Sequence, residues 1–312
     1  MAPLTDAAMP TLNQFKGCLL GLALGDAIGA PFEGGIVERT VWRIIGVTKR
    51  SEMRWTDDTQ MAVDVVESFL AKEELDPDDL SMRFASSYRW SRGYGPAAAK
   101  TLKRIRRGVP WKLANRSVYP GGSFGNGAAM RSPIVGLIYA KRPEALVSAA
   151  RQVASVTHAH ELGIEGAILL ATATELGARG CDSCEMIQQS LQLFSLDAFR
   201  ERLSTALTWL KDEEKPAAVE VARKLGRGIA AHESCVTAVY LALRFRQSPF
   251  LDLQHFVVSV GGDVDTIGAM AGAVWGVMNG FDNLPLPALS TLEQRDRLID
   301  LATSLHSKVT AI

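Results

Sequence analysis

Hydrophobic residues recur along most of the chain at intervals of three and four positions, and long alternating runs are absent. This spacing is typical of amphipathic helices, whereas a half-buried strand would alternate with a period of two. The predicted helices span 12–30, 59–73, 78–91, 96–107, 127–140, 143–156, 161–179, 182–194, 197–212, 216–230, 234–246, 250–260, 266–279 and 288–309. Only 41–48 reads as a possible strand, and one strand forms no sheet. The pattern therefore predicts an all-α fold, a compact helical bundle in a single domain over residues 1–312.

The composition fits that fold and excludes several classes of function. The 312 residues include 34 basic and 34 acidic side chains, so the formal net charge is zero. A chain without net charge has no overall attraction to nucleic acid or to an anionic membrane. Hydrophobic residues make up 47% of the chain, which is enough for a large core and excludes extended disorder.

The cysteines and the N-terminal segment both favour a cytoplasmic protein. Four cysteines are too few for a disulfide scaffold, and they suit a reducing compartment. Residues 1–10 contain Asp6 and no basic cluster, so they do not resemble a signal peptide. The apolar run 18–30 is interrupted by Asp26 and by glycines, and we expect it to be too short to span a bilayer of about 30 Å. No membrane contact is expected, and a monomer is the default for a compact helical fold.

Two sets of glycines recur every four residues, so each set lies along one helix face. They are Gly17, Gly21, Gly25 and Gly29 near the start of the chain, and Gly268, Gly272 and Gly276 near its end. Glycine in a helix interior costs about 1 kcal/mol relative to alanine, so each set indicates a close approach. One interpretation is tight helix packing, and the other is two central helices brought together around a site. The two interpretations are compatible.

Two acidic turns stand at predicted helix starts and contain oxygen ligands for a cation. They are Thr56, Asp57 and Asp58 in WTDDTQ, and Asp263, Asp265 and Thr266 in GGDVDT. Helix capping is the alternative for each turn alone, because Asp and Thr accept hydrogen bonds from the free N–H groups there. Carboxylate and hydroxyl oxygens suit Mg²⁺ or Mn²⁺, whereas zinc prefers His or Cys. Two such turns predict a two-metal centre, for which the two helix starts must converge in the folded chain.

Two further motifs add chemistry to this hypothesis. In GDAIGAPFE, Asp26 lies within an apolar helix and needs a partner if it is buried, which suits a group that supports metal ligands. Glu33 follows Pro31 on a loop, where it is either a solvated side chain or a carboxylate that faces a cleft. The glycine-rich turn 121–127 precedes a helix, so its N–H groups could bind a phosphate, and Phe124 could stack on a ring. This turn lacks the Lys-Ser/Thr of a Walker loop.

Together these motifs resemble those of the ADP-ribosylglycohydrolase family, which includes dinitrogenase reductase-activating glycohydrolase and the mammalian ADP-ribosylhydrolases. The similarity runs from Gly17 to about Gly280 through five segments in the expected order: GCLLGLALGDAIGAPFE, WTDDTQMA, GGSFGNGAAMR, THAHELGIEGAI and GGDVDTIGAMAGAVWG. The resemblance implies the compact all-α fold of that family, with two divalent cations at its centre, Mg²⁺ or Mn²⁺.

The resemblance also implies roles for individual residues. Six positions match metal ligands of the family: Thr56, Asp57, Asp58, Asp263, Asp265 and Thr266. Glu33 matches the catalytic or gating glutamate. Six more match positions that bind ADP-ribose: Ser123, Phe124, Gly125, Asn126, Gly127 and His158. No ligand position departs from the family pattern, which argues against an inactive, crystallin-like descendant.

The expected activity is hydrolysis of the bond between ADP-ribose and a modified protein side chain, arginine or serine, or a small conjugate. Glycosidic cleavage develops oxocarbenium character at the ribose anomeric carbon, and two metals can orient the ribose hydroxyls and hold a water. Glu33 would then act as general base or general acid, which the sequence leaves open. Two alternatives remain: a two-metal phosphoesterase, which usually has His ligands and an α/β scaffold, and a non-catalytic protein of this fold that binds ADP-ribose.

Overall fold

The computed structural model describes residues 9–311, without the side chains of residues 37 and 38. In this part of the chain the backbone forms helices and no strand, which confirms the predicted all-α fold. The α-helices are α1 (Leu12–Gly29), α2 (Ile36–Ile45), α3 (Asp57–Lys72), α4 (Pro77–Ser87), α5 (Pro96–Arg106), α6 (Trp111–Ala114), α7 (Pro133–Ile138), α8 (Pro143–Ser155), α9 (Glu161–Ala178), α10 (Ser183–Leu193), α11 (Asp197–Lys211), α12 (Ala218–Lys224), α13 (Ala231–Arg244), α14 (Phe250–Val260), α15 (Val264–Asn279), α16 (Leu286–Ser290) and α17 (Arg295–Ala311). Short 3₁₀ helices are η1 (Ala30–Phe32), η2 (Trp90–Arg92), η3 (Asn126–Ala128) and η4 (Phe281–Asn283).

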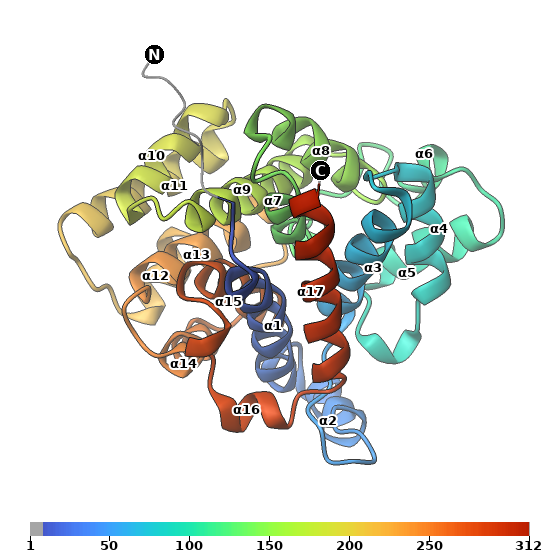
Figure 1. The fold of residues 1–312 in the computed structure, drawn as a ribbon, viewed down its shortest axis with the longest axis horizontal. Helices are drawn as coiled ribbons and strands as arrows, with labels where there is room; N and C mark the ends of the chain where they lie inside the picture. Colours follow the sequence, from blue (N-terminus) through green and yellow to red (C-terminus); the bar gives the residue numbers. More distant parts are fainter. Residues whose placement is uncertain (1–8, 312) are drawn as a thin grey trace.

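Helices α1 and α15 lie side by side at the centre of the molecule, although they come from opposite ends of the chain (Figure 1). Their glycines face one another in three pairs: Gly17 with Gly276, Gly21 with Gly272 and Gly25 with Gly268. In each pair, a Cβ added to the α1 glycine would lie under 3.0 Å from the partner's carbonyl oxygen. Backbones this close leave no room for a side chain, so the glycine stripes do serve tight helix packing.

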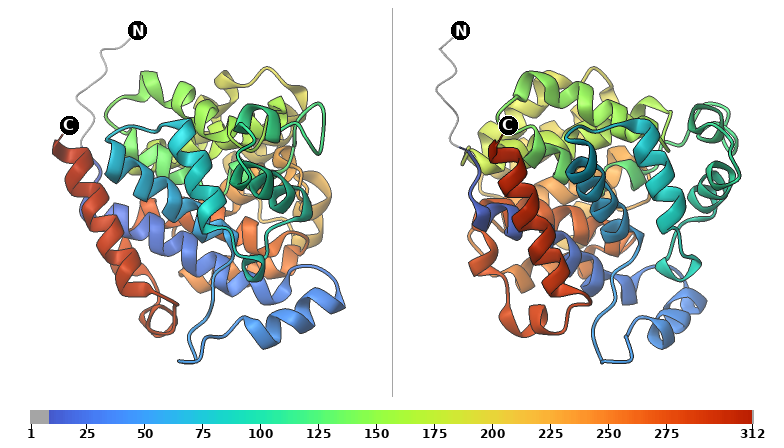
Figure 2. Two further views of the ribbon diagram at one scale, coloured as in Figure 1. Left: turned by 90° about the vertical axis from the view of Figure 1, so that its right-hand side faces the viewer. Right: turned by 45° about the vertical axis from the view of Figure 1, so that its right-hand side comes forward.

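The other helices surround this pair (Figure 2). Helices α3 and α17 pack on α1, whereas α9 and α13 pack on α15. The buried hydrophobic side chains form a contiguous cluster that extends from Phe15 in α1 to Val309 in α17. This core joins the first and last helices, and the single domain stays a prediction.

One helical stretch of the described chain, Leu12–Phe32, is long and apolar enough to cross a membrane, judged by length and composition. The expected interruption of the apolar run 18–30 is wrong, because Asp26 and the glycines lie within an unbroken helix. Within the protein, 78% of the apolar window is buried. A buried core helix passes the same test as a membrane span, so the length alone is weak evidence for a membrane.

Several predicted elements are wrong, for identifiable reasons. The possible strand 41–48 is helical as far as Ile45, because its hydrophobic positions also recur at helical spacing. The predicted helix 127–140 is divided into η3 and α7, since Pro133 starts a new helix. The predicted helix 216–230 ends at Lys224, before Gly226 with φ 95°. The predicted helix 288–309 is divided into α16 and α17 around Gln294, which has φ 54°.

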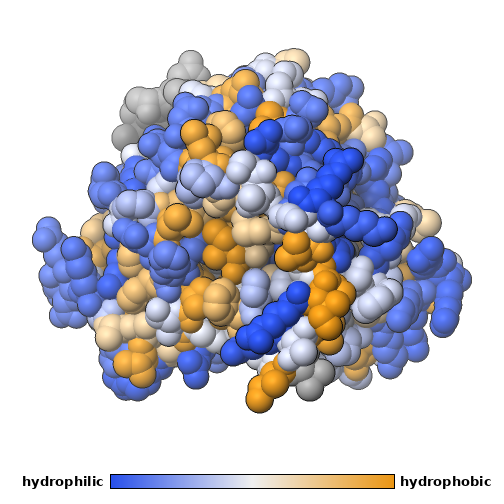
Figure 3. Space-filling view, turned by 90° about the horizontal axis from the view of Figure 1, so that it is seen from below, coloured by the Kyte–Doolittle hydropathy of each residue, from blue (hydrophilic) through white to orange (hydrophobic). Residues whose placement is uncertain are grey.

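Helix α2 lies at the lower edge of the molecule in Figure 1 and packs few of its side chains inside. Ile36, Val41 and Ile44 are exposed on it, and Trp42 is buried. Figure 3 shows the molecule from this side, with hydrophobic side chains standing among hydrophilic ones.

Two predictions about the chain as a whole can be placed on the structure. Of the segment 1–10, for which the sequence predicts no signal peptide, only Met9 and Pro10 belong to the described residues. All four cysteines are free, as expected of a chain without a disulfide scaffold.

Candidate active site

A cavity of about 360 Å³ lies between the starts of α3 and α15, the N-terminal half of α5 and the glycine-rich loop. It is lined by these predicted site residues: Glu33, Asp57, Asp58, Ser123, Phe124, Gly125, Asn126, Gly127, His158, Asp263, Asp265 and Thr266. Thr56 is the one predicted residue outside this lining. The fold thus gathers, in one cavity of a size usual for small-molecule sites, side chains that are more than two hundred positions apart in the sequence.

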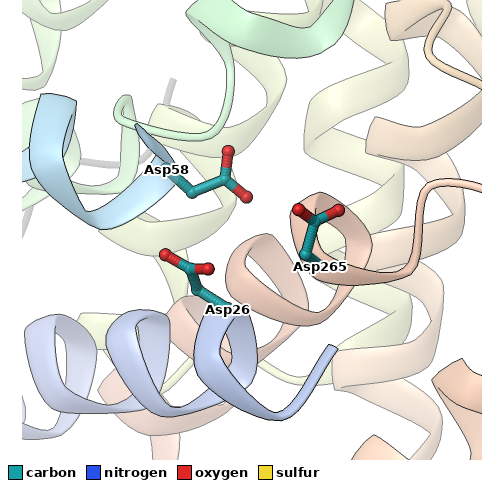
Figure 4. Close-up of side chains that lie close together, drawn as sticks. All are labelled: Asp26, Asp58 and Asp265. Atoms are coloured by element: carbon teal, nitrogen blue, oxygen red, sulfur yellow. The ribbon is translucent and has the colours of Figure 1, made fainter. Parts of the chain in front are cut away.

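The acidic end of the cavity combines carboxylates from the start of the chain and from its last third. Oxygen atoms of Asp26, Asp58 and Asp265 lie within 4.8 Å of one another, and so do those of Glu33, Asp263 and Asp265. Figure 4 shows Asp58 and Asp265 pointing toward each other from α3 and α15, with Asp26 beside them on α1. The predicted convergence of the two acidic turns is confirmed.

Helix starts and close packing place these carboxylates. Asp58 stands in the first turn of α3 and Asp265 in the first turn of α15, where the helix dipole favours negative charge. Gly29 lets the end of α1 approach the acidic turn at the start of α15. A Cβ added to Gly29 would lie 2.5 Å from the Cα of Asp265, so no larger residue fits there without a shift. Gly261 and Gly262, with φ 71° and 82°, form the left-handed bend that leads into α15.

Asp26 is fully buried and holds the start of α3 in place. Its carboxylate accepts hydrogen bonds from the N–H of Thr56 at 2.9 Å, the N–H of Thr59 at 3.1 Å and the hydroxyl of Thr59 at 2.6 Å. Asp26 therefore fixes the turn that carries Asp57 and Asp58. This geometry agrees with the hypothesis that Asp26 supports the metal ligands.

Burial makes this cluster electrostatically costly. Burial, together with the neighbouring carboxylates of Asp26 and Asp57, raises the pKa of Asp58 well above its usual value. The pKa of Asp265 is raised in the same way by burial, Glu33 and Asp58. The Oδ2 atom of Asp58 is buried and has no hydrogen-bond partner among the described residues. A divalent cation with oxygen ligands would supply the missing partner and the missing charge, so this donor set fits Mg²⁺ or Mn²⁺.

The two predicted threonine ligands have different positions. The hydroxyl of Thr56 accepts a hydrogen bond from the N–H of Asp58 at 3.3 Å, so the capping interpretation holds for Thr56. The hydroxyl of Thr266 lies 3.4 Å from Oδ1 of Asp58 and links the two acidic turns across the cavity. Thr266 faces the cavity, whereas Thr56 lies behind it, and metal ligation by either one stays a prediction.

Glu33 stands where α1 gives way to the loop before α2. It is half-buried and follows η1, in which Pro31 stops α1 from continuing. Its carboxylate completes the cluster with Asp263 and Asp265. A carboxylate at the rim of a buried acidic cluster can exchange a proton with a group bound there.

The opposite end of the cavity consists of backbone and neutral side chains. The Nδ2 of Asn126 donates to Oδ2 of Asp263 at 2.5 Å and to the hydroxyl of Ser234 at 2.9 Å, which ties the glycine-rich loop to the acidic end. The ring of Phe124 is 48% exposed and has an edge contact with His160 at a centroid distance of 5.9 Å. Phe124 therefore remains partly exposed where it lines the cavity.

His158 lies next to this loop as a buried neutral ring. Its Nδ1 is 2.8 Å from the hydroxyl of Thr157. Burial and the positive charge of Arg131 lower the pKa of His158 to about 3. The ring faces the loop, since a Cβ added to Gly127 would lie 3.0 Å from its Cε1 atom.

Sequence reasoning did not identify several residues of the cavity. The wall provided by α5, the loop before it and the loop after α6 carries no motif: Gly93, Gly95, Pro96, Ala97, Ala98, Thr101, Asn115, Val118 and Tyr119. Ile229, in the loop before α13, lines the cavity without a motif as well. Thr157 also lines the cavity, and Arg131 supports both Thr157 and the loop from behind. Their only signal was their place inside the segments GGSFGNGAAMR and THAHELGIEGAI.

Comparison with known proteins gives a consistent result. The sequence profile of a family described as ADP-ribosylglycohydrolase matches residues 8–311. The chain is 35% identical to the human protein named ADP-ribosylhydrolase ARH3, over 96% of this chain and 94% of that protein. It is 31% identical to an uncharacterized protein of Archaeoglobus fulgidus, over 94% of this chain and 96% of that protein.

The fold has a similar counterpart among solved structures. A chain described as part of an ADP-ribosylglycohydrolase-related protein complex superposes with a TM-score of 0.71 and 27% sequence identity. The superposition covers 96% of this chain and 98% of that one. The similarity therefore extends over nearly the whole arrangement of helices.

Proposed function

The chain belongs to the ADP-ribosylglycohydrolase family, and we propose that within it the protein releases ADP-ribose from a modified arginine or serine side chain, or from a small conjugate. Membership makes it a hydrolase of glycosyl bonds that acts on ADP-ribosylated substrates. The linkage, the metal ions and the role of each residue belong to the proposal.

The observation that carries the proposal is the division of one cavity into two ends. Asp58 and Asp265 face each other at one end, and Asp58 has a buried oxygen without a partner. At the other end, the loop that contains Phe124 and Asn126 offers an exposed ring, an amide and backbone N–H groups. An ADP-ribosyl group has matching parts, since its adenine and diphosphate suit the loop and its terminal ribose suits the acidic end.

The residues that would hold two divalent cations, Mg²⁺ or Mn²⁺, are those of the two acidic turns: Thr56, Asp57, Asp58, Asp263, Asp265 and Thr266. When bound, such ions neutralise the carboxylates, orient ribose hydroxyls and lower the pKa of a bound water. Asp26 keeps the first turn in position through its hydrogen bonds to Thr56 and Thr59.

Glu33 is the proposed proton carrier of the reaction. It lies at the rim of the cluster on a loop, within 4.8 Å of Asp263 and Asp265 carboxylate oxygens. From there it can take a proton from the attacking water or give one to the leaving atom.

A substrate panel tests this proposal. The purified protein is incubated with ADP-ribosyl-arginine peptide, ADP-ribosyl-serine peptide, O-acetyl-ADP-ribose and a generic phosphate ester, and released ADP-ribose or phosphate is measured. We expect ADP-ribose release from at least one ADP-ribosyl linkage and no hydrolysis of the phosphate ester. Release of phosphate alone would favour the phosphoesterase, and ADP-ribose binding without any release would favour a non-catalytic protein.

A further inference from the structure

Arg131 is a fully buried cation behind the glycine-rich loop. Among the described residues, no carboxylate lies within salt-bridge distance of its guanidinium, which is unusual for a buried charge. Its contacts are instead the carbonyl oxygens of Gly127 and Val153, the hydroxyl of Thr157 at 2.9 Å and the face of the Phe84 ring, 4.7 Å from the ring centroid. A chain that buries an arginine in this way uses its donors to fix other groups.

Two of these contacts belong to the cavity. The Gly127 carbonyl is part of the glycine-rich loop, and Thr157 is hydrogen-bonded to His158. One guanidinium therefore holds both the loop and the residue that orients the histidine. Arg131 itself does not line the cavity, so it acts on a ligand only through these neighbours.

The hydrogen bonds determine which nitrogen of His158 carries the proton. A guanidinium only donates, so the Thr157 oxygen must accept from Nη2 of Arg131. Thr157 has a single hydroxyl hydrogen, and its only other hydrogen-bond partner in the described chain is Nδ1 of His158, at 2.8 Å. The Thr157 oxygen has two lone pairs, but if it accepted from both neighbours its buried hydrogen would have no partner among the described residues. We therefore assign that hydrogen to Nδ1, which makes Nδ1 the unprotonated nitrogen. In a neutral ring, the proton then resides on Nε2.

The Nε2 atom faces the ligand side of the cavity. A Cβ added to Gly127 would lie 3.3 Å from it, and one added to Gly125 would lie 3.7 Å from it. Both glycines line the cavity, as does His158. The absence of side chains at these two glycines leaves Nε2 open to a ligand.

We propose that Arg131 and Thr157 are positioning residues that hold His158 as its Nε2–H tautomer, so that the ring presents a neutral hydrogen-bond donor to an acceptor oxygen of the ligand. This arrangement selects for a phosphate or ribose oxygen that accepts, and it disfavours a ligand group that donates. The identity of the ligand rests on the proposed function, whereas the tautomer follows from this chain's own contacts.

The tautomer can be measured without any substrate. Protein labelled with ¹⁵N-histidine is examined at pH 7 by long-range ¹H–¹⁵N NMR, which separates protonated from unprotonated ring nitrogens, and the His158→Gln variant identifies the His158 signals. We expect a protonated Nε2 and an unprotonated Nδ1. An Nδ1–H tautomer or an imidazolium in the wild-type protein would overturn the proposal.

Two variants extend the test to the positioning residues. Thr157→Val and Arg131→Met each remove one link, so the His158 signals should shift toward a mixture of tautomers, whereas Thr157→Ser should keep the wild-type pattern. The dissociation constant for free ADP-ribose, measured by calorimetry, should rise by about 3–10-fold in Thr157→Val, because His158 loses a hydrogen bond that orients its ring.

Thr174→Val is the matched control, since the hydroxyl of Thr174 is also buried and donates to the Leu170 carbonyl outside the cavity. It should lose similar stability and leave both the tautomer and the ADP-ribose affinity unchanged. A wild-type His158 pattern in folded Thr157→Val overturns the role of Thr157. If a variant fails to fold, the spectrum of the wild-type protein still decides the tautomer. If the wild-type protein has the Nε2–H tautomer but hydrolyses none of the substrates, only the proposed function is refuted.

Discussion

The acidic end and the loop end of the cavity differ in the sign of their buried charge. At the acidic end, oxygens of Asp58 and Asp265 lie within 4.8 Å of each other, and no basic side chain of the described residues is paired with them. At the loop end, Arg131 is a buried charge that lies behind neutral groups and has no carboxylate partner in the part of the chain that the structure describes. The acidic end thus has carboxylates without a basic partner, whereas the loop end has the cation Arg131 behind the residues that line the cavity.

The difference indicates how each end is completed. We expect the acidic end to depend on ions from solution, because the raised pKa values of Asp58 and Asp265 favour proton uptake by the cluster without cations. The loop end is preorganised by the protein itself, since backbone N–H groups and a fixed histidine need no added ion. Metal should therefore control the acidic end strongly and the loop end weakly.

Removal of metal should give the largest effect. Chelation with EDTA should abolish hydrolysis, and Mg²⁺ or Mn²⁺ should restore it better than Zn²⁺, because the ligands are oxygens. The midpoint of thermal unfolding should also fall, since ions that bind only the folded state stabilise it. Activity assays and calorimetry of the same samples check both. Full turnover in protein shown to be metal-free would break the comparison.

The Glu33→Gln variant should lose about 10²–10⁴-fold in catalytic rate, the usual contribution of general acid–base catalysis. Its affinity for ADP-ribose should change far less, because the diphosphate and adenine are expected at the loop end. Single-turnover kinetics and calorimetry separate the two quantities. Turnover close to that of the wild type would remove Glu33 from the proposed mechanism.

The Asp26→Asn variant should weaken metal binding by about 10–100-fold, the typical effect of losing a group that orients metal ligands. The amide keeps the size of the carboxylate but cannot accept all the hydrogen bonds from Thr56 and Thr59. Metal titration followed by calorimetry measures the loss. An unchanged metal affinity would show that the first turn of α3 keeps its position without the carboxylate of Asp26.

The Gly29→Ala variant should disturb the acidic end by moving Asp265, whose Cα an added Cβ would approach to 2.5 Å. We expect a loss of about 1–3 kcal/mol in the free energy of unfolding, as for overpacked sites, together with weaker metal binding. Gly121→Ala is the control: a Cβ there meets nothing within 4 Å, so the change should stay within about 0.5 kcal/mol. Equal effects of the two variants on metal binding would contradict this prediction.

The smallest effect on the active site itself is expected for a pH dependence outside the cavity. Burial raises the pKa of Asp64 on α3 to about 7, although hydrogen bonds from Ser87 and Gln60 oppose it. Because the folded state holds this proton more tightly than the unfolded chain, Asp64 makes stability fall as the pH rises from about 4 to about 7. The Asp64→Asn variant should lack this contribution. Urea unfolding of both proteins at pH 5 and pH 8 measures it, and equal pH slopes would contradict it.

The sequence predicts the helices and the two acidic turns well, because both signals are local. Helical periodicity and the Asp-rich helix starts can be read within a window of about 15 residues. The close approach of two helices, seen at Gly21 and Gly272, is also predicted by the sequence, because glycines every four residues line one helix face. The errors fall where local patterns compete, as in 41–48, where β-branched residues at helical spacing form α2.

Other parts of the site depend on tertiary contacts, which a single sequence does not display. Thr56 looks like its neighbours Asp57 and Asp58 in the motif, but its hydroxyl caps α3. Nothing local distinguishes Arg131 from the surface arginines of the chain, because its burial results from how α3, α4 and α8 pack around it. The wall formed by α5 consists mainly of small residues without chemistry of their own.

The pairing of α1 with α15 also determines when the core can form during biosynthesis. Gly17 emerges from the ribosome roughly 250 residues ahead of Gly276, its counterpart in the central contact. At about 5–20 residues per second, the apolar helix α1 waits on the order of 10–50 s for its partner. During that interval Asp26 lacks the fully enclosed environment of the finished fold. The catalytic cavity is therefore among the last parts of the nascent chain to form, and until then α1 is a natural target for chaperones.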